Sequence, residues 1–115
     1  MHILEIPSFL PPYGGHFCIE QAKALMGRGH QVGVLHCQQL GVTVYPWHFL
    51  TARTDRWHEI MQPFGDSRTL NIYRTNMRGI PRNIRQNQQR YCRIIEEMFR
   101  EYCSRYGTPD ILHAH

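Results

Sequence analysis

Two glycines lie where an apolar stretch ends and a helical pattern begins. Gly14 and Gly15 follow Pro11 and Pro12 and immediately precede a predicted helix. Because glycine has no Cβ, its amides can approach an anion closely, and the dipole of a helix that starts there favours negative charge. The spacing matches neither G-x-G-x-x-G nor G-x-x-x-x-G-K-S/T, which removes the main support for a dinucleotide site or a P-loop. The two glycines are thus compatible with a phosphate-binding turn and with a plain strand-to-helix turn.

Two histidines lie at the carboxyl end of the strand-like segment "DILHAH". Ligands of an open parallel sheet bind beyond the carboxyl ends of its strands, so His113 and His115 are candidate functional groups, although strand histidines also pack in cores. We expect the two side chains on opposite faces of the strand. No H-E-x-x-H or C-x-x-C spacing occurs, and we predict no metal site.

A third candidate is a segment rich in arginine. Twelve of the thirteen basic residues are arginine, and no Asp or Glu lies between Asp66 and Glu96. Arginine pairs well with planar anions such as phosphate and carboxylate. We predict that Arg74, Arg78 and Arg82 form an acceptor-binding or anion-binding rim, facing a phosphorylated acceptor or an anionic membrane surface. A solvated charged face explains the same segment without any ligand.

The elements that must position these residues alternate between strand and helix. Apolar runs broken by Pro and Gly predict strands, and apolar residues spaced by three or four predict helices. A strand–helix–strand unit makes its two strands parallel, and we expect the strand order 3-2-1-4. Residues 38–68 show no sustained period, with one helical turn expected near "RWHEIM". The predicted strands are 2–9, 31–37, 69–76 and 110–115, and the predicted helices are 17–29 and 83–105.

Length and composition limit the classes that remain. A chain of 115 residues with 42% hydrophobic residues and a net charge of +4 suits one packed domain. No apolar run approaches the roughly 18 residues of a membrane span, and we expect a cytoplasmic protein. The four cysteines lie in apolar stretches, which indicates free, buried thiols.

Three motifs in order resemble the N-terminal domain of family 4 glycosyltransferases, which have the two-lobed GT-B fold. They are Pro-Pro-x-Gly-Gly at 11–15, a helix ending in "RGHQV", and "PDILHAH" at 109–115. The resemblance implies an α/β fold with a Rossmann-like parallel sheet, as in the first half of a GT-B N-terminal domain. It implies sugar transfer from a nucleotide-sugar donor with retention at the anomeric carbon, with no cofactor beyond that co-substrate. Gly14 and Gly15 would face the donor diphosphate. His115 is the first candidate to face the donor sugar, and His113 is the second.

The resemblance also implies what surrounds this domain. The family's donor-binding lobe follows the N-terminal one, so residues 1–115 would be part of the acceptor-side domain, inactive alone. The implied partners are a nucleotide-sugar and a sugar or lipid-linked acceptor, in the cytoplasm or peripherally at the inner membrane face, without nucleic acid. An open sheet edge predicts a homodimer. The alternative is a non-catalytic half-Rossmann module for binding or assembly. A methyltransferase would need a glycine-rich acidic cofactor turn, and a receiver domain would need an acidic cluster at the strand ends. This sequence has neither.

Overall fold

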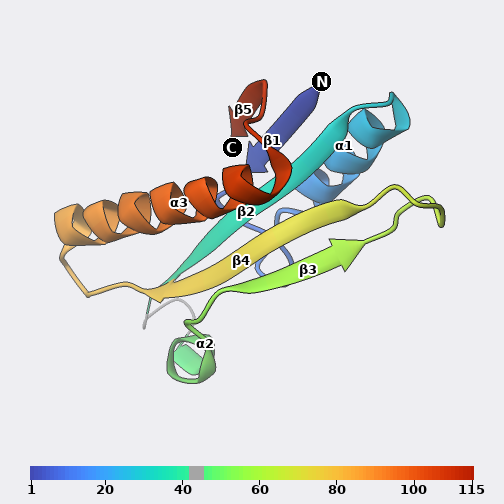
Figure 1. Cartoon of the computed structure of the whole chain (residues 1–115). Helices are drawn as coiled ribbons and strands as arrows, with labels where there is room; N and C mark the ends of the chain where they lie inside the picture. Colours follow the sequence, from blue (N-terminus) through green and yellow to red (C-terminus); the bar gives the residue numbers. More distant parts are fainter. Residues whose placement is uncertain (42–45) are drawn as a thin grey trace.

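The computed structural model describes residues 1–41 and 46–115, in which one five-stranded sheet carries helices on both faces (Figure 1). Most elements agree with the predicted ones to within a few residues. The strands are β1 (His2–Ile6), β2 (Gln31–Leu40), β3 (Trp57–Met61), β4 (Leu70–Arg78) and β5 (Ile111–Ala114), and the helices are α1 (His16–Gly27), α2 (Pro46–Thr51) and α3 (Ile84–Tyr106).

The sheet order is β3-β4-β2-β1-β5, in which β4, β2, β1 and β5 are parallel. This confirms the predicted order of the four parallel strands. The fifth strand was not predicted: β3 lies within "RWHEIM", where we expected a helical turn, and it pairs antiparallel with β4. The His58 ring stacks on Tyr73 of β4 with 4.4 Å between centroids, which helps to hold this half-exposed edge strand. Residues 42–45, within the predicted irregular segment 38–68, lie outside the described residues.

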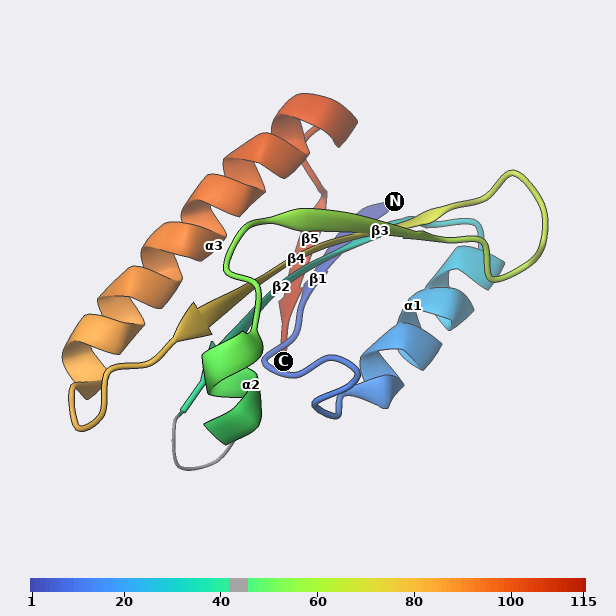
Figure 2. The same ribbon diagram turned by 90° about the horizontal axis from the view of Figure 1, so that it is seen from below.

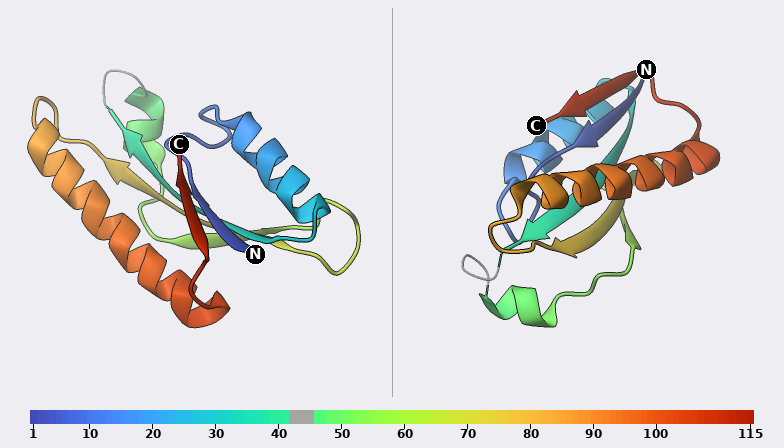
Figure 3. Two further views of the ribbon diagram at one scale, coloured as in Figure 1. Left: turned by 90° about the horizontal axis from the view of Figure 1, so that it is seen from above. Right: turned by 90° about the vertical axis from the view of Figure 1, so that its left-hand side faces the viewer.

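The two long helices cover opposite faces of the sheet (Figures 2 and 3). Because side chains alternate along a strand, β2 sends Val32 and Val34 toward α1 and Leu35 toward α3. The buried residues on the α1 face are Leu10, Cys18, Ala22, Met26, Val32, Val34, Leu70 and Ile72. Those on the α3 face are Leu4, Leu35, Met98 and Tyr102. The sheet therefore separates two small apolar layers.

The buried side of α3 is formed by residues four apart in the sequence. Met98 and Tyr102 are its fully buried residues, with Ile94 packed one turn earlier, whereas Cys92 is exposed. The prediction that all four cysteines are buried is therefore wrong for Cys92, and Cys103 is only half-buried. Ile94, Met98 and Tyr102 thus form a stripe with spacings of four residues.

Tyr102 packs directly against the backbone of β2. A Cβ placed on Gly33 would lie 2.3 Å from the Tyr102 hydroxyl oxygen and 2.6 Å from two ring carbons. The hydroxyl also hydrogen-bonds His2 Nε2 on β1 at 2.5 Å. Gly33 thus provides the space that lets α3 approach the sheet. In the part of the chain that the structure describes, no helix is both long and apolar enough to cross a lipid bilayer.

Candidate functional site

A cavity of about 520 Å³ lies where β1 and β5 end, beside the start of α1. One side of the cavity is the loop after β1, and another is the C-terminal histidine. Its lining residues are Pro7, Ser8, Phe9, Tyr13, Gly14, Gly15, Phe17, Cys18 and His115. The structure therefore brings together the glycine turn and His115, which come from distant parts of the sequence.

The glycine turn is shaped by two left-handed backbone conformations. Gly14 has φ of 106° and Gly15, the N-cap of α1, has φ of 73°. A Cβ on Gly15 would lie 2.0 Å from the Phe9 carbonyl oxygen, whereas a Cβ on Gly14 would have no described atom within 4 Å. Among the described residues of α1, no side chain caps the N-terminus and none in the first turn is acidic. The positive end of the helix dipole therefore faces this region with no acidic side chain in the first turn of α1 to balance it.

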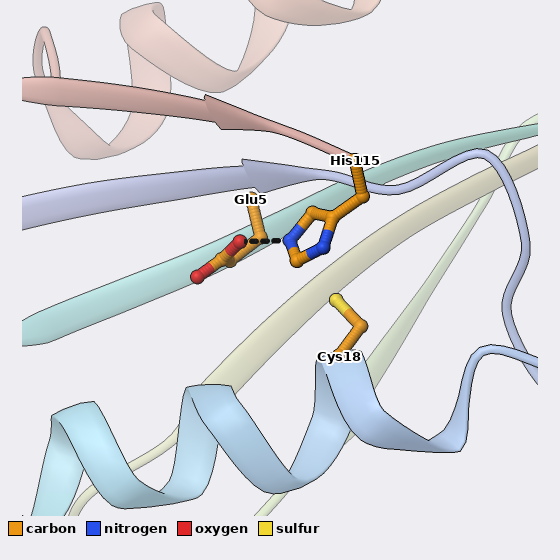
Figure 4. Close-up of side chains that lie close together, drawn as sticks. All are labelled: Glu5, Cys18 and His115. Atoms are coloured by element: carbon orange, nitrogen blue, oxygen red, sulfur yellow. Dashed lines mark hydrogen bonds and ion pairs between the residues drawn. The ribbon is translucent and has the colours of Figure 1, made fainter.

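His115 is held by a buried carboxylate (Figure 4). Its Nε2 lies 2.5 Å from Oε2 of Glu5, and His113 Nδ1 lies 3.0 Å from the same oxygen. Glu5 is fully buried, whereas the His115 side chain is 12% exposed and the His113 side chain 45%. Our expectation that the histidines lie on opposite faces is wrong, because strand residues two apart share a face. Both imidazoles thus reach one carboxylate.

Cys18 adds a third potential metal ligand to this group. The Glu5 carboxylate, the Cys18 thiol and the His115 imidazole offer ligand atoms that all lie within 4.8 Å of one another. Burial, and next the negative charge of Glu5, raise the pKa of the Cys18 thiol to about 12. A thiol binds a metal ion as thiolate, whereas the Cys18 thiol is protonated at neutral pH when no metal is bound. The Cys18 thiol is therefore a neutral wall of the cavity.

The three predicted arginines do not line this cavity, and their side chains have different partners. Arg74 is buried, and its Nη2 donates to the Pro11 carbonyl at 2.7 Å, with Glu59 at 3.5 Å from Nη1. Arg78 donates to the carbonyls of Phe49 at 2.6 Å and Ala52 at 3.0 Å. These two guanidinium groups stabilise the backbone.

Arg82 alone of the three predicted arginines is exposed. It lines a separate cavity of about 350 Å³ before α3. The structure does not bring the three predicted arginines together into one rim.

A buried histidine on β2 is expected to make the protein sensitive to acid. Burial, followed by the charge of Arg74, lowers the pKa of His36 from 6.5 to about 4. The unfolded chain then binds a proton that the folded chain does not, so stability is lost as the pH falls from about 6.5 to about 4. We expect the titration of His36 alone to lower the free energy of unfolding by about 3 kcal/mol across that pH range.

Urea unfolding of the wild type at about pH 7.5 and about pH 4.5 measures this loss. The variant His36→Gln should be less sensitive to acid, whereas His16→Gln, at an exposed position, should behave like the wild type. Equal acid sensitivity of all three proteins would show that His36 titrates normally in the folded state.

Glu5 is the residue of this site that sequence reasoning missed. It is the one acidic residue in the first apolar strand, between Leu4 and Ile6. A charge inside an otherwise apolar strand needs a partner when that strand is buried, and this signal could have revealed it. Its partners could not be found from the sequence, since they lie about a hundred residues away in β5 and beyond.

Searches of protein-family models, of curated proteins and of solved structures found no match to this chain.

Proposed function

We propose that the chain is the N-terminal part of a retaining glycosyltransferase of the GT-B type, and that its cavity receives the diphosphate and sugar of a nucleotide-sugar donor. One observation carries the proposal: the glycine turn and His115 line the same cavity at the carboxyl ends of parallel strands. Open parallel sheets bind ligands in this position. The alternation of strand and helix and the mostly parallel sheet are compatible with this reading.

Each wall of the cavity suits one part of such a donor. The uncapped start of α1 favours a negatively charged diphosphate. The His115 imidazole, held by Glu5, is a polar group at an otherwise mostly apolar wall and would contact the sugar. Among the predicted arginines, exposed Arg82 is the one that can contact an acceptor directly. Arg74 and Arg78 instead hold backbone carbonyls of Pro11, Phe49 and Ala52.

The proposal predicts that the chain binds nucleoside diphosphates and nucleotide-sugars at the glycine turn. Backbone amide NMR with added UDP, GDP or UDP-glucose should shift the signals of Gly14, Gly15, His16 and Phe17. We expect a Kd in the millimolar range or below, about −4 kcal/mol or stronger. The substitution His115→Ala should reduce the shifts caused by UDP-glucose more than those caused by UDP, because His115 is assigned to the sugar.

A matched control is His30→Ala, because His30 lies beside Met1 at the other end of the strands. This variant should bind all three nucleotides as the wild type does. The proposal is wrong if none of the nucleotides shifts the turn at millimolar concentration. It is also wrong if His115→Ala and His30→Ala have the same effect on every nucleotide.

A further inference from the structure

We propose that Glu5 is a positioning residue that fixes the orientation and the protonation pattern of His115, so that Nδ1 is the ring nitrogen left for a ligand. The role of that ligand rests on the proposed function, but the state of the ring does not. The proposal takes the Glu5 carboxyl group as ionised; an ionised carboxylate only accepts hydrogen bonds, so in this arrangement His115 Nε2, 2.5 Å from Glu5 Oε2, carries the proton. A neutral imidazole with a proton on Nε2 has its lone pair on Nδ1.

The position of the ring leaves Nδ1 on the side away from Glu5, where the Cys18 thiol also lines the cavity, as Figure 4 shows. The backbone around His115 is fixed as well. Its amide donates to the Ile6 carbonyl at 3.2 Å, and its carbonyl accepts from the Ser8 hydroxyl at 2.7 Å. The Phe17 ring contacts the imidazole edge-on with 5.1 Å between centroids. Rotation of the ring would break the contact with Glu5, so one orientation is favoured.

Burial makes the contact with Glu5 strong. The carboxylate is fully buried, and its Oε1 has no hydrogen-bond partner among the described residues. The imidazoles of His113 and His115 are thus the groups that stabilise the charge of Glu5. A hydrogen bond with an ionised partner is shorter and stronger than a neutral one, and low local dielectric strengthens it further. The lone pair of Nδ1 could then accept a hydrogen bond from a sugar hydroxyl or take up its proton.

Side-chain NMR of the whole 115-residue chain, labelled with ¹⁵N, tests this without any ligand. At a pH where histidine is neutral, the Nε2 proton of His115 should be visible, shifted downfield and slow to exchange with water, while Nδ1 should show no attached proton. Glu5→Leu removes the acceptor, and the protected Nε2 proton should be lost. His113→Asn is the matched control, because it removes the other imidazole and leaves Glu5 in place, so the proton should persist.

Three results would overturn the proposal. They are a protected proton on Nδ1 of the wild-type His115, the absence of any protected imidazole proton there, or an unchanged Nε2 proton in a folded Glu5→Leu variant. If Glu5→Leu does not fold, the wild type and His113→Asn still decide, because the proposal requires the Nε2 proton in both. Failure of the nucleotide titration would leave this result intact, so the two proposals fail separately.

Discussion

Replacing Gly15 by alanine is expected to destabilise the fold by about 3 kcal/mol or more, as overpacking and a left-handed backbone act together. The new Cβ would lie 2.0 Å from the Phe9 carbonyl oxygen and 2.5 Å from its carbon, both of them backbone atoms that cannot turn aside. The loop after β1 would have to move away from the start of α1. Urea unfolding, monitored by circular dichroism, measures the loss of stability.

Gly14→Ala is the matched control for this prediction. Its Cβ would meet no described atom within 4 Å, so only the cost of a positive φ is left, about 1–3 kcal/mol. Gly14 is therefore the better position for testing ligand approach, since a larger side chain there would block the cavity with less harm to folding. Equal destabilisation by the two substitutions would contradict the close contact between Gly15 and Phe9.

The second large effect is expected where α3 meets the sheet. Gly33→Ala should destabilise the protein by about 1–3 kcal/mol, because the methyl group would overlap the ring of Tyr102. Tyr102→Ala alone should cost about 3–5 kcal/mol through loss of a buried ring. In the Tyr102→Ala background, Gly33→Ala should be nearly neutral. The ring is gone, and alanine in a strand loses less conformational entropy on folding than glycine does.

The four proteins of this double-mutant cycle are compared by urea unfolding at one pH. A coupling free energy of about 1 kcal/mol or more supports direct packing. Additive effects would show that the ring and the glycine are not in contact in solution. Gly41→Ala is a control for the substitution itself, because no described atom lies within 4 Å of a Cβ there.

The parallel part of the sheet was predictable from the sequence, and its antiparallel edge was not. Strands such as β2 are buried on both faces, so an almost continuous apolar run identifies them. β3 instead has one neighbour and mixes Trp57, His58 and Glu59 with apolar residues, which gives no clear period. Its contacts with Tyr73 and Arg74 depend on tertiary structure, and these decide its conformation.

The candidate site was predictable in part for a similar reason. Gly14, Gly15 and His115 were found because they occur at the ends of elements, where parallel sheets bind ligands. The role of Glu5 depends on the pairing of β1 with β5, which brings its backbone beside that of His113. Charge alone misled the assignment of a common rim to Arg74 and Arg78, because a long guanidinium side chain can serve distant carbonyls instead of a ligand.

The pairing of β1 with β5 also determines when the site can exist. Glu5 and His115 are separated by 110 residues, and the strand that brings them together has four residues, all exposed. Closing so long a loop is entropically costly, and contacts between distant residues slow folding. The β1–α1–β2 unit can therefore form early, while the cavity is completed only when β5 docks. If β5 detaches for part of the time, the observed affinity for any ligand of His115 is lowered by the fraction of molecules in which the strand is docked.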